Sequence, residues 1–126
     1  MGDLRKDVTP VIYRPVRYEI MMKAAEKYDV RARRMFGGMG IYTGEKMFAF
    51  LFEEDIGLKL SPDDLAEAMN LPGAGPVQPD PNVEPMREYV RLPKEVVEDY
   101  ELFVHWVERS ANYARRRLAQ SNSTGA

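Results

Sequence analysis

The chain has 126 residues, of which 44% are hydrophobic and 30% charged, and its formal net charge is -2. This length and composition fit one globular domain, and no apolar run approaches the roughly 20 residues that a membrane-spanning helix needs. The absence of cysteine excludes disulfides, thiolate zinc sites and cysteine nucleophiles. The first residues lack the apolar segment of a signal peptide, so we expect a cytoplasmic protein that is not bound to a membrane.

The first predicted elements are an arm and a helix. Residues 1–15 contain two prolines and no hydrophobic periodicity, which predicts an extended N-terminal arm. From Ile20 to Tyr28, apolar residues recur at spacings of three and four, which is typical of a helix with one buried face. We expect this helix to run from about Val16 to Asp29.

Four strand-like segments follow, at residues 31–36, 39–43, 46–52 and 56–60. Their connections are too short for a helical crossover, which predicts an antiparallel meander. The third segment is apolar on both faces, so we expect it in the centre of the sheet. Between the first two segments, Gly37 and Gly38 predict a tight turn, because glycine adopts a positive φ without a Cβ clash.

A second helix, a loop, a fifth strand and a last helix complete the predicted order. Ser61 and Pro62 are typical of a helix start, and the prolines that follow predict a loop through residue 82. We expect a strand at residues 86–92, a last helix entered at Pro93, and a second helix start at Asp99. Residues 119–126 are expected to be a frayed tail. The stripe predicted to face the sheet comprises Tyr100, Phe103, Val107, Ala111, Ala114 and Leu118, with Leu102, Trp106 and Tyr113 beside it.

These segments together resemble the N-terminal domain of the TfoX/Sxy family of competence regulators. The resemblance rests on Arg33-Arg34-Met35-Phe36-Gly37-Gly38-Met39-Gly40-Ile41-Tyr42, followed in order by Phe48, Leu58-Lys59, Tyr89, Leu92-Pro93 and Trp106. It covers residues 16–118 and implies a single α+β domain there. The implied fold has two layers, with helices packed on one face of an antiparallel sheet of about five strands, in the order α-β-β-β-β-α-β-α, similar to type III secretion chaperones. Full-length members carry a second, helical C-terminal domain, which we expect this chain to be too short to contain.

Within the family motif, most residues have a predicted structural role. We expect Gly37 and Gly38 to form the turn and Met35 and Phe36 to pack in the core. Gly40, Pro93 and Trp106 complete this structural set.

The sequence predicts no catalytic, cofactor or metal site. The single histidine, His105, is expected at the surface, because it points away from the apolar stripe and has no evident nucleophile or orienting partner. Residues 73–76 are glycine-rich but lack the Lys-Ser/Thr of a phosphate-binding loop. The acidic clusters Glu53-Glu54-Asp55 and Asp63-Asp64 do not follow calcium-loop spacing. The resemblance likewise implies no catalytic residues, so we expect a protein that is not an enzyme.

Six residues form the candidate partner-binding set: Arg33, Arg34, Lys59, Arg87, Tyr89 and Arg91. Strand alternation places Arg87, Tyr89 and Arg91 on one face, which would be a basic surface with an aromatic centre if the helices cover the other face. Such a surface suits an acidic peptide or single-stranded nucleic acid. The alternative is that these cations are solvated, or paired with residues 61–108, which hold 11 acidic and 3 basic side chains.

We therefore expect a regulatory or adaptor domain that acts through contacts with a protein partner. The acidic middle and basic end of the chain suit self-association, and we expect a homodimer formed through the open sheet face or the last helix. Nucleic-acid binding through the basic sheet face is the alternative, and an enzyme with an unrecognised site is a third possibility.

Overall fold

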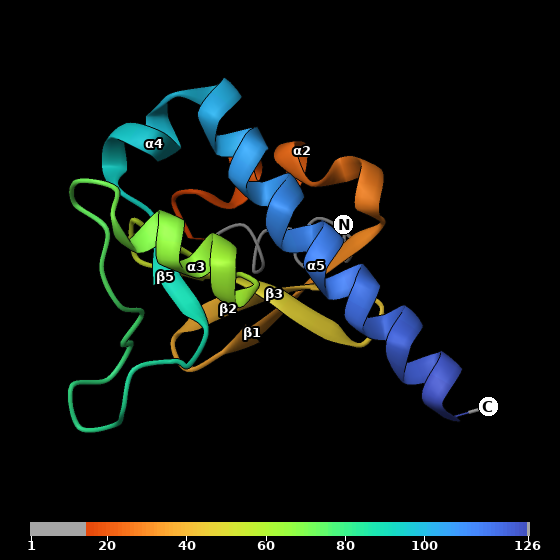
Figure 1. Ribbon diagram of the computed structural model, residues 1–126. Helices are drawn as coiled ribbons and strands as arrows, with labels where there is room; N and C mark the ends of the chain where they lie inside the picture. Colours follow the sequence, from red (N-terminus) through yellow and green to blue (C-terminus); the bar gives the residue numbers. More distant parts are fainter. Residues whose placement is uncertain (1–14, 126) are drawn as a thin grey trace, which may run out of the picture.

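The computed structural model describes residues 15–125, with side chains described as far as residue 119, so the arm expected at residues 1–15 lies outside the described part except for Pro15. Five strands form one antiparallel sheet in their order along the chain (Figure 1). The strands are β1 (Val30–Met35), β2 (Gly38–Thr43), β3 (Lys46–Phe52), β4 (Asp55–Lys59) and β5 (Tyr89–Arg91). The predicted meander and the central place of the third strand are confirmed.

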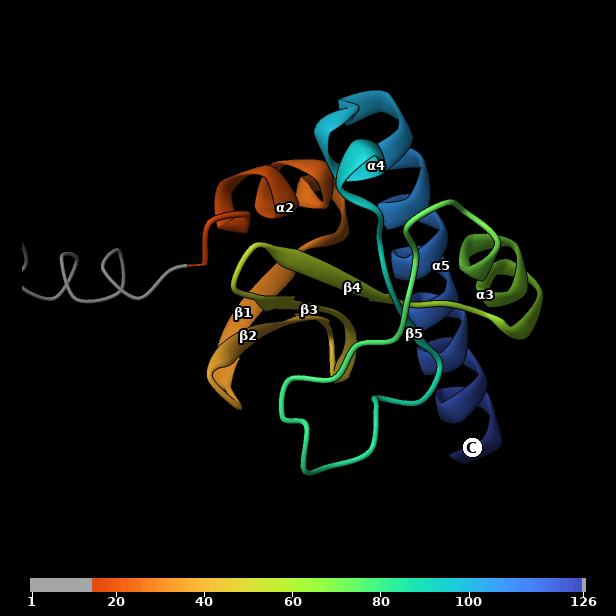
Figure 2. The ribbon, with the colours of Figure 1, turned by 90° about the vertical axis from the view of Figure 1, so that its left-hand side faces the viewer.

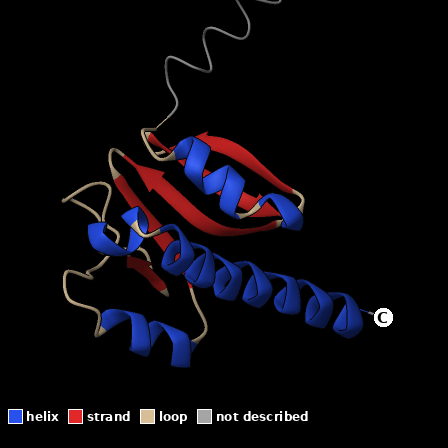
Figure 3. Ribbon diagram, turned by 90° about the horizontal axis from the view of Figure 1, so that it is seen from above, coloured by secondary structure: helices blue, strands red, loops and turns tan. Residues whose placement is uncertain are grey.

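The helices form a second layer on one face of this sheet (Figures 1 and 2). They are α2 (Tyr18–Ala24), the short 3-10 helix η1 (Glu26–Tyr28), α3 (Pro62–Met69), α4 (Lys94–Glu98) and α5 (Tyr100–Gly125). Seen from above, α2 and α5 lie side by side across the strands (Figure 3). The predicted α+β class, two-layer arrangement and element order are confirmed.

Helix ends follow the predicted local chemistry. The backbone N–H of Asp64 donates to Ser61 Oγ at 3.3 Å, and Pro62 occupies the first turn of α3. Pro93 precedes α4, and Asp99 starts α5 by accepting from the Leu102 N–H at 3.3 Å. Helix α5 then runs to Gly125, beyond the predicted end at residue 118, because no proline or glycine interrupts the chain after Pro93 until Gly125 itself.

The main core lies between the sheet and the helices. From α5, the predicted stripe is buried at Phe103, Val107, Ala111 and Ala114, and Trp106 beside it is only 4% exposed. Two apolar residues at the start of α5 are not covered, since Tyr100 and Leu102 are 38% and 47% exposed. The sheet contributes fully buried side chains to the same core: Ile41, Phe48, Ala49, Leu51, Ile56, Leu58 and Val90.

The opposite face of the sheet is not open, because the loop between α3 and β5 folds back across it (Figure 2). Gly75 and Arg91 exchange backbone hydrogen bonds of 3.3 and 2.7 Å, which fastens the loop to the edge of β5. Val77 lies over Gly57, where a Cβ would clash with it, and is buried with Phe50 in a second, smaller core. A cross-sheet loop of this kind was not predicted from the sequence.

The fifth strand is shorter than the predicted segment, which began at residue 86. The Met86 N–H donates to the Val77 carbonyl at 2.8 Å, within the loop, rather than to a strand neighbour. Glu88 has a φ of 68°, which turns the chain just before Tyr89. Ladder pairing with β4 therefore begins only at Tyr89.

Candidate protein-binding groove

The first hairpin turns one residue earlier than predicted. Its central residues are Phe36 and Gly37, with φ values of 52° and 76°, and Met35 pairs with Gly38. Two positive φ values in a two-residue turn are the type I′ pattern, which matches the twist of the flanking strands. Gly38 is needed for close packing instead, because a Cβ there would clash with the Leu51 carbonyl oxygen.

This turn holds the Phe36 ring in solvent, where 75% of the residue is exposed. The prediction that Phe36 packs in the core was therefore wrong. A left-handed backbone costs an ordinary L-residue roughly 1–2 kcal/mol, a cost that asparagine and glycine largely avoid. Neither the turn nor the core thus favours phenylalanine at this position, which directs attention to what its ring faces.

The Phe36 ring faces the loop between α3 and β5, and that loop is held by its own hydrogen bonds. The Asn82 N–H donates to Asp80 Oδ1 at 2.9 Å, and the Val83 N–H donates to the Asp80 carbonyl at 3.1 Å. Gln78 Nε2 donates to the Val83 carbonyl at 2.8 Å and closes the loop. Prolines in the loop restrict its backbone further, so the wall is pre-formed.

An open groove of ≈ 620 Å³ lies between the turn and the loop, and we call it the Phe36 groove. Its apolar surface includes Phe36, Val83, which is 53% exposed, and the half-buried Met86. The two charged residues among its described lining are both acidic, Asp80 and Glu84, and both are exposed. The complete lining is Phe36, Pro79, Asp80, Pro81, Val83, Glu84 and Met86.

The six residues predicted to bind a partner do not form one surface. Arg33 and Arg34 are exposed on β1, whereas Arg87 and Arg91 lie at or near β5, and these strands are the opposite edges of the sheet. Arg87 lies in the turn before β5, so its predicted alternation with Tyr89 does not apply. Arg91 is half-buried against Gly75, where a Cβ would clash with its guanidinium.

Two of the six already have partners within the chain. Tyr89 is 8% exposed, and its hydroxyl donates to the Met47 carbonyl at 3.2 Å, so it is not the exposed aromatic centre that was predicted. Burial, with a smaller contribution from neighbouring Tyr42, raises the pKa of the Tyr89 phenol. Lys59 Nζ lies 3.7 Å from a carboxylate oxygen of Glu88.

The described residues contain no evident metal site or membrane-spanning helix. No group of three or more histidine, cysteine, aspartate or glutamate side chains in residues 15–119 has the arrangement of a metal site. None of the helices described is both long enough and apolar enough to cross a bilayer. His105 is exposed, as predicted, with its ring edge-on to Trp106 at 5.7 Å between centroids.

Comparison with known proteins confirms the resemblance seen in the sequence. The sequence model of the TfoX N-terminal domain matches residues 22–114, which include β1 to β5 and the first half of α5. No curated protein matches the chain. The family match supports a regulatory domain related to competence. The chain belongs to the TfoX N-terminal domain family.

Proposed function

We propose that this domain is a non-enzymatic regulatory adaptor that binds a protein partner in the Phe36 groove. The occupant is an extended segment of the partner that places one large apolar side chain against Phe36 and Val83, next to a lysine or arginine. The observation that carries this proposal is the Phe36 ring, which is 75% exposed from an unfavourable backbone conformation beside a pre-formed apolar wall.

The groove divides affinity and specificity between its two kinds of surface. Covering the Phe36 ring removes apolar surface from water, and complete burial of such a side chain contributes about 1.5–3 kcal/mol. Asp80 and Glu84 are solvated carboxylates, so each ion pair with a partner contributes less, about 0–1 kcal/mol. The carboxylates therefore select partners with a lysine or arginine next to the bound apolar side chain, while the Phe36 ring and Val83 supply most of the binding energy.

A different protein fits the groove better than a second copy of this chain. Two identical grooves placed face to face would bring Asp80 and Glu84 of one copy towards the same carboxylates of the other. Such like-charge pairs oppose association. The homodimer expected from the sequence stays a prediction. Sedimentation of the wild-type chain at micromolar concentration would measure its oligomeric state.

A phage-displayed library of random peptides, selected on the immobilised full chain, tests the proposal. We expect enriched peptides to share one aromatic or large aliphatic residue next to lysine or arginine. A labelled peptide made from the enriched sequence should bind Phe36→Asn at least about tenfold more weakly than wild type by fluorescence anisotropy, since about 1.4 kcal/mol is lost with the ring. Leu102→Asn removes an apolar residue that is 47% exposed on α5 and should leave binding unchanged.

The charge preference gives a second readout at the same groove. Glu84→Lys should bind more weakly those peptides whose large apolar residue has lysine or arginine beside it. It should bind more tightly the same peptides with that lysine or arginine changed to glutamate. Equal affinity of all variants for the selected peptide, or selection of peptides with acidic neighbours by the wild type, would contradict the proposal.

A further inference from the structure

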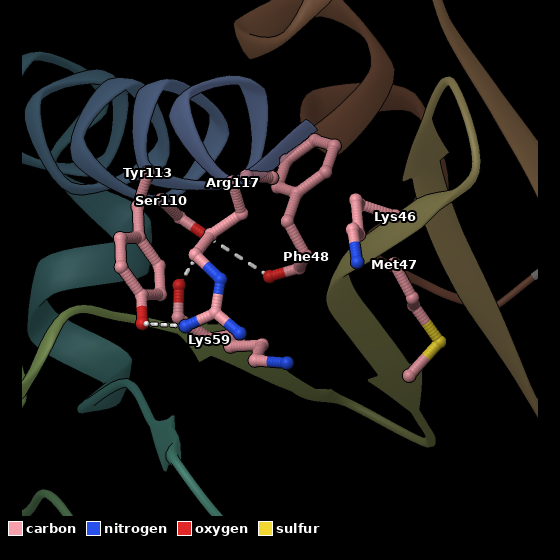
Figure 4. A pocket seen from close by; sticks show the side chains of 8 residues that line it. Lys46, Met47, Phe48, Lys59, Ser110, Tyr113 and Arg117 are labelled. Atoms are coloured by element: carbon pink, nitrogen blue, oxygen red, sulfur yellow. Dashed lines mark hydrogen bonds between the residues drawn. The ribbon is translucent and has the colours of Figure 1, made fainter. Parts of the chain in front are cut away.

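A second, smaller pocket lies between the middle of α5 and the ends of β3 and β4 (Figure 4). Its cations come from three separate elements: Lys46 begins β3, Lys59 ends β4, and Arg117 lies on α5. The pocket has a volume of ≈ 30 Å³, so it accepts one small group at a time. We call it the cationic pocket, and its lining is Lys46, Met47, Phe48, Lys59, Ser110, Tyr113, Ala114 and Arg117.

The floor of the cationic pocket is fixed by Ser110, which is fully buried. Pairing between β3 and β4 ends at Ala49 and Leu58, so the next two residues, Phe48 and Lys59, are not ladder partners. The Ser110 hydroxyl lies between their carbonyl oxygens, at 2.9 Å from that of Phe48 and 2.7 Å from that of Lys59. This bridge ties α5 to both strands and sets where Lys59 leaves the backbone.

Arg117 is oriented over the pocket by Tyr113, one helical turn before it. The guanidinium donates to the Tyr113 hydroxyl oxygen at 3.2 Å and lies 5.8 Å from the centre of that ring. The Tyr113 hydroxyl keeps its own hydrogen, which remains available for an acceptor in the pocket. Leu118 contacts Gly44 in the β2–β3 turn and anchors this part of α5 against the sheet.

The positive charge at this pocket is only partly compensated. Lys46 has no ion-pair partner among the described residues, and Arg117 interacts with an uncharged phenol. Among the described residues, the ion pair made by these three cations is that of Lys59 with Glu88, at 3.7 Å, and the Glu88 side chain is itself half exposed. Holding three cations around one pocket is unfavourable unless an anion joins them.

We propose that the cationic pocket binds a phosphate group, carried either by a nucleic-acid strand or by a small phosphorylated molecule. The planar guanidinium of Arg117 suits two phosphate oxygens at once, and the two lysines supply point charges. Tyr113 adds a neutral donor. Arg116, whose guanidinium lies 5.8 Å from the Tyr113 ring, would extend the contact along α5 for a longer ligand.

This site differs from the basic sheet face predicted from the sequence. Of that predicted set, only Lys59 lines the cationic pocket. The remaining cations, Lys46 and Arg117, reach it because α5 crosses the ends of β3 and β4. The site is also independent of the Phe36 groove, which shares none of its lining residues.

Two probes test the proposal on the full chain: inorganic pyrophosphate followed by amide shifts in NMR spectra, and a labelled single-stranded oligothymidylate followed by anisotropy at low salt. The double variant Lys46→Gln/Arg117→Gln should bind whichever probe the wild type binds about tenfold more weakly, as expected for lost charge-assisted contacts. The matched control, Arg33→Gln/Lys94→Gln, changes the net charge equally at exposed sites outside the pocket and should stay within about twofold.

The two probes separate the possible sources of phosphate. Oligonucleotide binding that pyrophosphate displaces, with a salt dependence shallower by about 1.4 in the double variant, identifies a nucleic-acid backbone. Pyrophosphate binding without oligonucleotide binding identifies a small phosphorylated ligand. Three outcomes overturn the proposal: no binding of either probe, equal loss in the control variant, or equal binding of polyglutamate.

Discussion

Replacing Phe36 by asparagine should make the domain more stable while weakening its binding in the Phe36 groove. The first turn requires positive φ at both central residues, 52° at Phe36 and 76° at Gly37. Asn-Gly is the sequence that such a type I′ turn prefers, and the left-handed conformation costs phenylalanine roughly 1–2 kcal/mol that asparagine largely avoids.

The loss from removing the ring is smaller than this gain. Phe36 is 75% exposed, so about a quarter of its surface is covered, and full burial would contribute about 1.5–3 kcal/mol. The variant therefore loses about 0.5 kcal/mol of burial and gains about 1 kcal/mol or more in the turn. We expect a net increase of roughly 0.5–1 kcal/mol in the free energy of unfolding, or a few degrees in melting temperature.

Urea denaturation followed by circular dichroism measures this change, and the selected peptide measures binding on the same sample. Phe36→Ala is the control, because alanine lacks the ring but keeps the unfavourable backbone conformation. It should lose binding without gaining stability. If Phe36→Asn lowered the free energy of unfolding by 1 kcal/mol or more, the ring would belong to the core and the groove would lose its main argument.

Three further changes probe the sheet and its two cores. Gly38→Ala should destabilise the domain by more than 2 kcal/mol in urea denaturation, because its Cβ would clash with the Leu51 carbonyl, and a tolerated alanine would contradict the packing described for β2 and β3. Ser110→Ala should cost about 1–3 kcal/mol by removing the one hydroxyl that the carbonyls of Phe48 and Lys59 share, while Ser110→Thr should retain part of that stability if the added methyl is accommodated. For Tyr89, the raised folded-state pKa means that the unfolded chain releases this proton first, near pH 10, so the stability from the neutral phenol is present below that pH and is lost above it. The free energy of unfolding, measured from pH 8 to 11.5, should thus fall more steeply with pH for the wild type than for Tyr89→Phe. Equal slopes for the two proteins would contradict the described burial of Tyr89.

The elements that were predictable are those with strong local signals. Strand-like segments joined by very short connections can only form an antiparallel meander, because a parallel arrangement needs longer crossovers. Ser61 and Pro62 define the start of α3, because the serine side chain caps a free N–H and proline fits the first helical turn. The start of β5 was less predictable. Residues 86–88 have strand-like composition, but the Met86 N–H donates to Val77 in the loop that crosses the sheet, and the positive φ of Glu88 turns the chain before the ladder begins. A local sequence pattern does not show that a distant loop competes with the neighbouring strand for the same backbone hydrogen bond.

The candidate sites were hidden for the same reason. The sequence predicts packing for Phe36, because it suggests a turn centred on Gly37 and Gly38. The turn lies one residue earlier, and Gly38 is required instead by the Leu51 carbonyl on β3, a neighbour that the local sequence does not reveal. The cationic pocket joins Lys46 to Arg117, which are 71 positions apart in the sequence. The one signal available was the arginine-rich end of α5, residues 115–117, whose meeting with β3 depends on the angle at which the helix crosses the sheet.

Strand β3 is the physical link between the two candidate sites. Phe50 faces the small core under the Phe36 groove, whereas Phe48 faces the helices and its carbonyl accepts from Ser110 beneath the cationic pocket. Both rings are almost fully buried, so β3 cannot shift on one side without moving packed atoms on the other. A ligand at one site would therefore change the affinity of the other site only if its binding moved β3. Both sites are already formed in the structure, so neither ligand needs to move this strand. We expect the peptide and the phosphate probe to bind additively, with the same peptide affinity whether or not the cationic pocket is occupied, and a change of more than about threefold would show that β3 has two arrangements.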